Sequence, residues 1–404
     1  MPGFKPKYLV MVEADANKNK YYRMIPHGDS WTAEYGRIGS SSQRRNYPIR
    51  QWNTKYNEKI RKGYIDQTGL VEDLISTEMP KQSEYKEIEN KSIAEILERL
   101  QSMARKAISK NYTISSNKVT QAMVDEAQAI ISNLLTIKDR EKFNDTLLKL
   151  FTVIPRKMGS VDSHIAHDDT QFAKIISREQ DLLDIMKGQI VQKQAIEEVK
   201  DNKQISDKTI IEQLGLEFEE CSPEDIAIIR VALGSCSDKF YKAWKVKNSR
   251  TQERFDAFVE ENNIKDIRLL FHGSRNENWW SIINSGLVLR PTNAVITGKM
   301  FGYGLYYAPK ARKSLGYTSL SGSYWANGTS SSGFMALMNV AYGKPYDVYS
   351  FNSKYYNFNY DALQRVSPGA NCLHAHKGSM LLNDEIIVYK EDQCTIKYLV
   401  EVKS

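Results

Sequence analysis

The sequence predicts a multidomain α+β protein with a small antiparallel-sheet module, an all-α helical bundle and a mixed α+β domain built on antiparallel sheets. Three observations lead to this prediction. Alternating strand patterns fill residues 7–66, apolar residues at helical spacing dominate residues 91–194, and strand-like runs between Gly, Ser and Tyr residues follow residue 225. A chain of 404 residues is long enough for two or three such domains.

The first region has the pattern of a small sheet crossed by one helix. Turn residues separate three runs with strand character: 8–12, 20–24 and 31–38. Trp52, Tyr56 and Ile60 then recur at helical spacing, which predicts a helix within residues 49–61 that packs across the sheet.

The middle region has the period of helices. Apolar residues recur on one helical face in several segments, led by Ile93, Val119, Leu147 and Phe172. Pro155 ends one of these helices. We expect an N-terminal domain over residues 1–75, a linker over 76–90, a helical domain over 91–215 and a C-terminal domain over 216–404.

The net charge of +7 lies in one part of the chain. Residues 1–66 hold 13 Lys and Arg against 6 Asp and Glu, so the remaining residues have no net charge. Such a local excess is typical of a surface that meets a polyanion, although a basic solvated face explains it equally well.

Several classes of protein are excluded by the composition. The longest apolar runs hold about five residues, against the roughly 20 that a membrane helix needs. The first 30 residues lack the apolar core of a secretory signal, and the four cysteines are widely scattered. We therefore expect an intracellular protein with reduced thiols, no membrane association and no metal, because the six histidines show no H-E-x-x-H or zinc-finger spacing.

Two glycine-rich phosphate-binding motifs, the Rossmann dinucleotide fingerprint and the P-loop, are also excluded. Gly302 and Gly304 begin a dinucleotide fingerprint, but its third glycine position holds Tyr307. Gly298 and Lys299 resemble the end of a P-loop, but Met300 stands where Ser or Thr is required.

Polar and aromatic residues of the last 140 positions form a more specific pattern. Each is weak by itself, but four segments carry them in a fixed order: residues 269–275 (LLFHGSR), 298–308 (GKMFGYGLYYA), 313–317 (KSLGY) and 383–389 (NDEIIVY). In these segments the chain resembles the poly(ADP-ribose) polymerases, the branch of ADP-ribosyltransferases with a His-Tyr-Glu triad. Residues 150–155 (LFTVIP) and 181–185 (DLLDI) resemble the family's helical regulatory domain, and residues 31–40 resemble its Trp-Gly-Arg (WGR) DNA-sensing domain.

The resemblance implies an enzyme that cleaves the nicotinamide–ribose bond of NAD+, its substrate, without a metal. It makes Glu385, His272 and Tyr306 the catalytic residues, with Glu385 stabilising the oxocarbenium-like transition state. The residues that it implies for NAD+ binding are Gly273, Ser274, Asn278, Lys313, Ser314 and Tyr317. Residues 290–298 correspond to the loop over the donor pocket.

The resemblance also implies activation by DNA strand breaks and a regulatory helical domain that restrains access to NAD+. The DNA contacts that we expect are Trp31, Arg37, Arg44, Arg45 and Arg50. One departure from the family is Tyr35, which occupies the tryptophan position of the Trp-Gly-Arg signature.

The expected activity is poly(ADP-ribose) synthesis on protein acceptors, including the enzyme itself, in the DNA damage response. We expect a monomer on DNA, located in the nucleus of a eukaryote or in the nucleoid or cytoplasm of a bacterium or virus-infected cell. Two alternatives stay open: a mono-ADP-ribosyltransferase, and a catalytically silent scaffold that binds DNA ends or NAD+.

Overall fold

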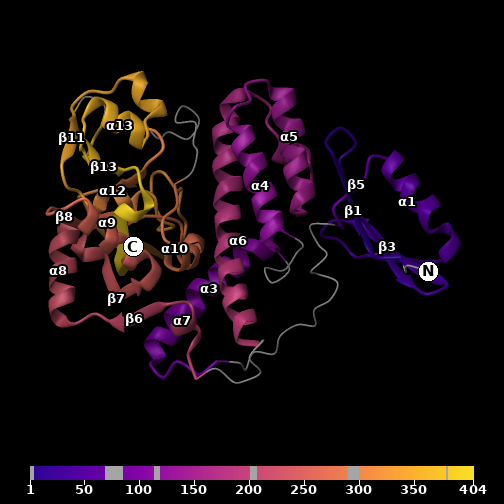
Figure 1. Cartoon of the computed structure of the whole chain (residues 1–404), viewed down its shortest axis with the longest axis horizontal. Helices are drawn as coiled ribbons and strands as arrows, with labels where there is room; N and C mark the ends of the chain where they lie inside the picture. Colours follow the sequence, from indigo (N-terminus) through magenta and orange to yellow (C-terminus); the bar gives the residue numbers. More distant parts are fainter. Residues whose placement is uncertain (1–3, 69–84, 113–118, 201–206, 290–299, 379–380) are drawn as a thin grey trace. The chain divides into compact units, whose positions relative to one another are not determined.

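The computed structural model describes residues 4–68, 85–112, 119–200, 207–289, 300–378 and 381–404, without the side chains of 191–200. The chain forms two compact units: Met1–Gln82 with Arg105–Ile190, and Ser83–Ala104 with Val191–Ser404. Figure 1 colours the chain by sequence and labels its elements. One unit boundary, between residues 82 and 83, falls within the expected linker, and the other two fall inside the helices Lys91–Asn111 and Phe172–Lys200. The division into three domains stays a prediction.

The first unit contains the expected antiparallel sheet. Its strands follow the order β4-β3-β2-β1-β5, with antiparallel pairing throughout. Their bounds are β1 Lys7–Glu13, β2 Lys18–His27, β3 Ser30–Arg37, β4 Gln43–Pro48 and β5 Ile65–Asp66. The sequence pattern predicted β1, β2 and β3, whereas the exposed edge strand β4 has no apolar alternation to reveal it.

Helix α1 (Trp52–Arg61) packs on this sheet as predicted. The Trp52 ring meets the ring of Trp31 at a centroid distance of 5.4 Å and an angle of 73°. Both side chains are buried with Leu9 and Met24 of the sheet. Aromatic burial of this kind stabilises a small module that has few other apolar residues.

Helices complete the first unit: α4 (Gln121–Leu134), α5 (Arg140–Val153), and the parts of α3 (Lys91–Asn111) and α6 (Phe172–Lys200) that lie within it. Thr120 and Asp139 cap the N-termini of α4 and α5 through side-chain oxygens. The rings of Phe143 and Phe172 stack with centroids 3.9 Å apart. The predicted helical region is thus confirmed, and α5 ends two residues before Pro155.

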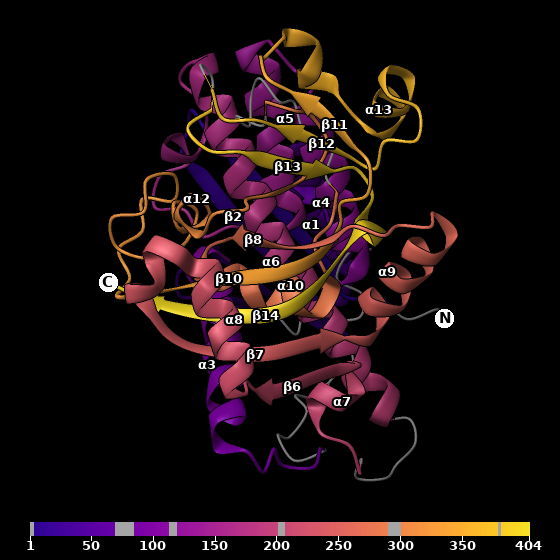
Figure 2. The same cartoon turned by 90° about the vertical axis from the view of Figure 1, so that its left-hand side faces the viewer.

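The second unit is built on two sheets, which Figure 2 shows one above the other. The larger sheet has the order β6-β7-β14-β10-β8, and the smaller has the order β11-β12-β13-β9. The strands are β6 Leu216–Glu220, β7 Phe240–Asn248, β8 Ile267–Gly273, β9 Leu305–Tyr307, β10 Ser332–Ala341, β11 Pro345–Val348, β12 Cys372–Ala375, β13 Glu385–Val388 and β14 Cys394–Lys403. All pairs are antiparallel except β11 with β12.

Short helices connect these strands: α7 (Ile210–Gln213), α8 (Pro223–Leu233), α9 (Ser249–Glu261), α10 (Trp279–Ser285), α12 (Ala311–Leu315) and α13 (Tyr360–Val366). The first part of α3 also belongs to this unit. There Arg99 donates two hydrogen bonds to the buried Glu401 of β14, at 2.7 and 3.0 Å. Within the described residues, no helix is both long and apolar enough to cross a membrane.

Candidate active site

The two sheets of the second unit meet at the end of β8. Phe271 and Ala308 exchange two backbone hydrogen bonds of 2.9 Å, which join β8 to the end of β9. The next residue, His272, has its Nδ1 3.1 Å from the carbonyl oxygen of Tyr306. This junction brings together segments that are more than 30 residues apart in the sequence.

Gly273 lies against the backbone of α12. A Cβ atom at this position would sit 2.0 Å from the carbonyl oxygen of Ser314, far inside van der Waals contact. Only glycine therefore allows β8 and α12 to approach so closely. The buried Ser314 and the Gly273 backbone, both predicted to bind NAD+, are neighbours in the structure.

The first residue of β13, Glu385, forms an ion pair with Lys313 of α12. The two side chains are only 12% and 14% exposed. Such a shielded pair holds the carboxylate in one place and keeps it surrounded by little water. The contact brings together two residues that the sequence motifs placed 72 positions apart.

Two tyrosines complete this group. The Tyr306 hydroxyl accepts a hydrogen bond from the Phe301 N–H at 3.0 Å and donates one to the Gly302 carbonyl at 3.1 Å. Burial and, to a smaller extent, the negative charge of Glu385 raise the pKa of Tyr306 well above 10 and that of Tyr317, which is 40% exposed, to about 12. Both rings therefore lie within electrostatic reach of Glu385 and stay neutral at physiological pH.

The remaining predicted NAD+ contacts lie just after β8. Asn278 donates a hydrogen bond of 3.0 Å to the Ser274 hydroxyl, so these two side chains form one polar pair. The predicted loop of residues 290–298 lies outside the described residues.

An aromatic neighbour of Tyr317 was not predicted. The ring of Trp325 stacks on that of Tyr317 at a centroid distance of 6.1 Å, and Tyr324 meets Trp325 edge-on at 4.7 Å. The Trp325 backbone N–H donates to the Gly316 carbonyl, which fixes the segment. The adjacent Tyr324 and Trp325 in a Gly- and Ser-rich segment are the signal in the sequence that could have revealed this contact.

Comparisons with known proteins agree with this arrangement. Residues 231–404 match the family model of the poly(ADP-ribose) polymerase catalytic domain. The chain is 32% identical over 186 residues to uncharacterized protein 101L of invertebrate iridescent virus 6, covering 45% of this chain and 76% of that protein. It is 31% identical over 168 residues to the poly(ADP-ribose) polymerase-like protein 100L of the same virus, covering 41% of this chain and 87% of that protein. The chain belongs to the poly(ADP-ribose) polymerase family.

A longer match reaches beyond the polymerase catalytic domain. Poly(ADP-ribose) polymerase 2-A of Oryza sativa subsp. japonica is 25% identical over 314 residues, which are 67% of this chain and 44% of the rice protein. The chain therefore spans less than half of that relative. The polymerase catalytic domain implies NAD+ as substrate, and all the predicted catalytic and NAD+-binding residues lie within it.

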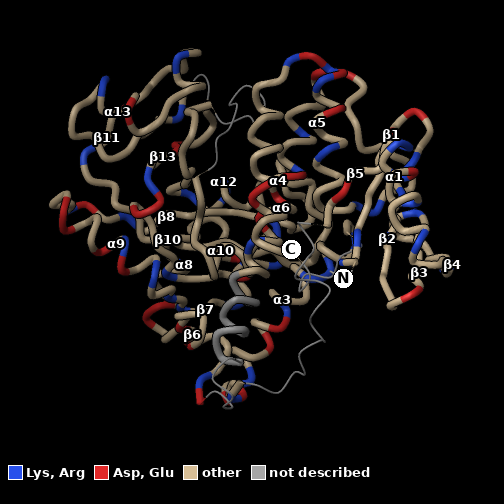
Figure 3. Tube along the Cα trace, turned by 45° about the vertical axis from the view of Figure 1, so that its right-hand side comes forward, with Lys and Arg blue, Asp and Glu red and all other residues tan. Residues whose placement is uncertain are grey.

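The N-terminal residues predicted to bind DNA in this polymerase-family chain lie in three different environments. The predicted DNA contact of Trp31 is corrected by its burial. Its ring is fully buried and its Nε1 donates a hydrogen bond of 3.2 Å to the Pro48 carbonyl, so it is not available to DNA. Arg44, Arg45 and Arg50 are exposed, and the Arg44 side chain is 72% accessible. Figure 3 shows further Lys and Arg residues along α1.

Arg37 has a different environment from these exposed arginines. Its guanidinium donates hydrogen bonds to the Gly159 carbonyl at 2.8 Å and to the Met158 carbonyl at 3.2 Å. It also bonds the backbone and side chain of Asn17. Arg37 thus ties β3 to the segment that follows α5, within the first unit. Tyr35, two residues earlier, stacks on Tyr22 at 5.7 Å.

Proposed function

We propose that the protein is a DNA-break-activated ADP-ribosyltransferase that transfers ADP-ribose from NAD+ and builds poly(ADP-ribose) on protein acceptors, including itself. The observation that carries this proposal is the shielded Glu385–Lys313 ion pair beside the junction of the two sheets. In a family with an NAD+ substrate, a carboxylate held in this way is suited to stabilise positive charge on a ribose.

The residues around the junction fit a nicotinamide-bearing substrate. The Gly273 backbone lies so close to the Ser314 backbone that any side chain at position 273 would collide with the Ser314 carbonyl oxygen. We assign the carboxamide to Gly273 and Ser314 and the nicotinamide ring to Tyr306 and Tyr317. Neutral aromatic rings exclude water and fix the orientation of a planar ligand.

The chemical step follows from the charge of Glu385. When the nicotinamide–ribose C–N bond breaks, nicotinamide leaves as a neutral molecule and positive charge develops on the ribose. Glu385 stabilises this charge and accepts the proton of the acceptor hydroxyl, whose oxygen then bonds to the ribose carbon. Lys313 holds the Glu385 carboxylate in place, and His272 binds the adenosine ribose.

The second part of the proposal is activation by DNA. Arg44, Arg45 and Arg50 are exposed on β4 and the turn that follows it, in the part of the chain that carries the charge excess. Lys and Arg on such a surface displace counterions from a phosphate backbone. Arg37 connects this module to the segment after α5, which gives DNA binding a physical route to the helices.

The catalytic proposal is tested with Glu385→Gln, which keeps the shape of the side chain and removes its charge. Wild type and variant are incubated with NAD+ and broken DNA, and the products are sized on a gel. We expect the variant to lose long polymers and most NAD+ turnover. Long polymers made by the variant would refute the role of Glu385, and single ADP-ribose units made by wild type would favour mono-ADP-ribosylation.

DNA activation is tested by comparing NAD+ turnover with intact circular DNA and with nicked or blunt DNA. We expect stimulation by broken DNA, with a preference for ends that bear phosphate. Equal turnover in all samples would refute the activation model while leaving the transferase chemistry in place.

A further inference from the structure

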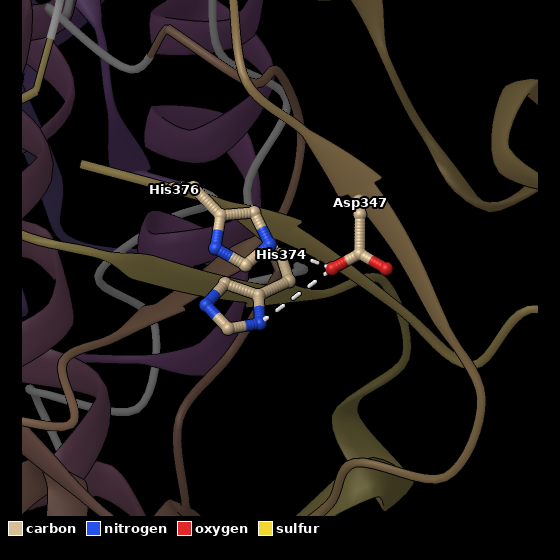
Figure 4. A group of neighbouring side chains, drawn as sticks. All are labelled: Asp347, His374 and His376. Atoms are coloured by element: carbon tan, nitrogen blue, oxygen red, sulfur yellow. Dashed lines mark hydrogen bonds and ion pairs between the residues drawn. The ribbon is translucent and has the colours of Figure 1, made fainter. Parts of the chain in front are cut away.

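A cluster of two histidines and one aspartate, none of which is assigned to NAD+, lies on the smaller sheet of the second unit. Asp347, His374 and His376 each offer one ligand atom, and these atoms lie within 4.8 Å of one another. Figure 4 shows both imidazole rings directed at the Asp347 carboxylate. Asp347 Oδ1 lies 2.7 Å from His376 Nε2 and 3.9 Å from His374 Nδ1.

The sheet register explains why these side chains converge. Asp347 on β11 is the direct partner of His374 on β12 in the one parallel strand pair of the described sheets. His376 follows two positions after His374, and residues at this spacing point to the same face of a strand. Ala375 between them pairs with Glu385 on β13, so the neighbouring strand carries the proposed catalytic residue.

We propose that Asp347, His374 and His376 bind a zinc ion or a closely related divalent transition metal. Two imidazoles and one carboxylate form an established ligand set for zinc, with a fourth position left to water. Tetrahedral zinc with nitrogen ligands at about 2.0 Å places its ligand atoms roughly 3.3 Å apart. The separations of 2.7 and 3.9 Å from Asp347 Oδ1 lie on either side of that value, so metal binding requires the side chains to shift.

The groups around His374 prepare its Nδ1 to act as a ligand. The carboxylate of Asp384 lies 3.4 Å from His374 Nε2, which is the arrangement of a metal-binding histidine whose far nitrogen is held by a carboxylate. The Tyr342 hydroxyl lies 2.8 Å from His374 Nδ1 and donates its proton to the lone pair of that nitrogen, so a bound metal ion takes the place of this hydrogen bond.

Neighbouring aromatic rings hold the His376 imidazole in place, and the exposed Asp347 side chain leaves the cluster open to a metal ion from solvent. The Tyr349 ring stacks on that of His376 at 4.4 Å, and the imidazoles of His374 and His376 stack at 3.9 Å. The Asp347 side chain is 42% exposed, so an ion can reach the cluster from solvent.

The test uses the full chain, stripped of metal with a chelator and titrated with Co²⁺ while its visible d–d absorption is recorded. We expect one Co²⁺ per chain, displaced by Zn²⁺, and a higher unfolding temperature with Zn²⁺ because the ion binds only the folded state. His376→Ala and Asp347→Asn should weaken binding by more than about tenfold, and Asp384→Asn by roughly 10- to 100-fold.

The matched control is His167→Ala. His167 is an exposed histidine with its Nε2 3.7 Å from a carboxylate oxygen of Asp162, so it tests whether any His–Asp pair suffices. This variant should bind Co²⁺ as wild type does. His376→Gln, which keeps a polar side chain of similar length, serves if His376→Ala fails to fold.

Two results would overturn the proposal: no cobalt band from wild type at millimolar Co²⁺, or equal binding by wild type and both His376 variants. Binding that survives in these variants with thiolate charge-transfer absorption would assign the ion to a cysteine such as the partly exposed Cys221. None of these measurements needs NAD+, so their outcome is independent of the proposed transferase activity.

Discussion

At the scale of single residues, the candidate active site depends on atoms that approach closely and on charges that are shielded from water. Gly273 is the sharpest example, because the carbonyl oxygen of Ser314 occupies the space where a side chain would begin. The Glu385–Lys313 pair is the second, because each charge compensates the other at low exposure. A substitution of a few atoms at either position should therefore lower stability or NAD+ turnover more than an ordinary surface substitution does.

Gly273→Ala should both destabilise the fold and reduce NAD+ turnover. The new methyl group meets backbone rather than a flexible side chain, so β8 or α12 must move, at a cost of about 1–3 kcal/mol. Thermal unfolding and NAD+ consumption measure the two effects. Gly159→Ala is the control, since nothing lies within 4 Å of its added Cβ. Equal unfolding temperatures for the two variants would contradict the close approach seen at Gly273.

At the scale of elements, the first unit is held together by polar contacts between its sheet and its helices. Asn19 of β2 donates to the Arg156 carbonyl at 2.9 Å, and Gln67 donates to Thr152 of α5 at 3.0 Å. The Arg156 side chain forms an ion pair with Glu179 of α6, and both side chains are 2% exposed. One polar network therefore connects β2, the segment after α5 and α6.

Glu179→Ala should lower the free energy of unfolding by about 3–5 kcal/mol, because it leaves the buried Arg156 charge without compensation. Urea unfolding followed by circular dichroism measures this change. Glu126→Ala, on the exposed face of α4, should change stability by less than about 0.5 kcal/mol. A small effect at Glu179 would mean that water or another group reaches the Arg156 guanidinium.

Arg37→Ala should separate DNA binding from the stimulation of NAD+ turnover that follows it. Because Arg37 donates to the carbonyls of Met158 and Gly159, its loss should reduce DNA stimulation of NAD+ turnover more than it reduces DNA affinity. The double variant Arg44→Ala, Arg45→Ala should instead weaken DNA affinity and lower the slope of log affinity against log salt by about 2. Titrations at several salt concentrations, with turnover measured in parallel, distinguish the two variants. Stimulation that follows affinity in both would exclude a transmitting role for Arg37.

At the scale of the whole molecule, the second unit contains tyrosines that the fold keeps protonated. Burial raises the pKa of Tyr306 and Tyr389 well above 10, and that of Tyr317 to about 12. In the unfolded chain these groups lose their protons near pH 10, so the folded state holds more protons above that pH. The contribution of these tyrosines to the free energy of unfolding is therefore fully present below pH 10 and is lost as the pH rises beyond it.

Tyr389→Phe should reduce this alkaline loss of stability. Each buried tyrosine contributes at most about 1.4 kcal/mol per pH unit to the slope, and the variant removes one of them. At pH 8 the variant should be less stable by about 1 kcal/mol, because the Tyr389 hydroxyl donates a 2.8 Å hydrogen bond to the Phe301 carbonyl. Urea unfolding at pH 8, 10 and 11 measures both effects. An unchanged slope would show that Tyr389 ionises in the folded protein.

Long, periodic elements were predictable from the sequence, and elements that depend on distant partners were not. The patterns predicted β1, β2, β3 and the long helices, because their apolar residues repeat over several turns or pleats, and they predicted a strand-rich region after residue 225. Strand β7 and edge strands such as β4 were missed. Their residues alternate weakly, and their pairing is decided by the sheets that they join.

The same contrast holds for the sites. The motifs around His272, Tyr306 and Glu385 are contiguous, so a single sequence carries them. The metal cluster joins Asp347 to His374 only through the register of β11 and β12, which no spacing rule contains. Trp31 was assigned to DNA from its motif, but its apolar ring is more stable in the core beside Trp52.

The position of β14 in the larger sheet has a consequence for synthesis of the protein. This strand pairs with both β7 and β10, although it is the last strand along the sequence. A nascent chain that has not reached residue 403 therefore lacks a central strand, and its β7 and β10 have unpaired edges. The N-terminal sheet and its helix α1 can form while translation continues, because domains fold as units in the order in which they emerge. We expect ribosome-bound chains to acquire the basic module first and the transferase fold only once the residues of β14 have emerged from the ribosome.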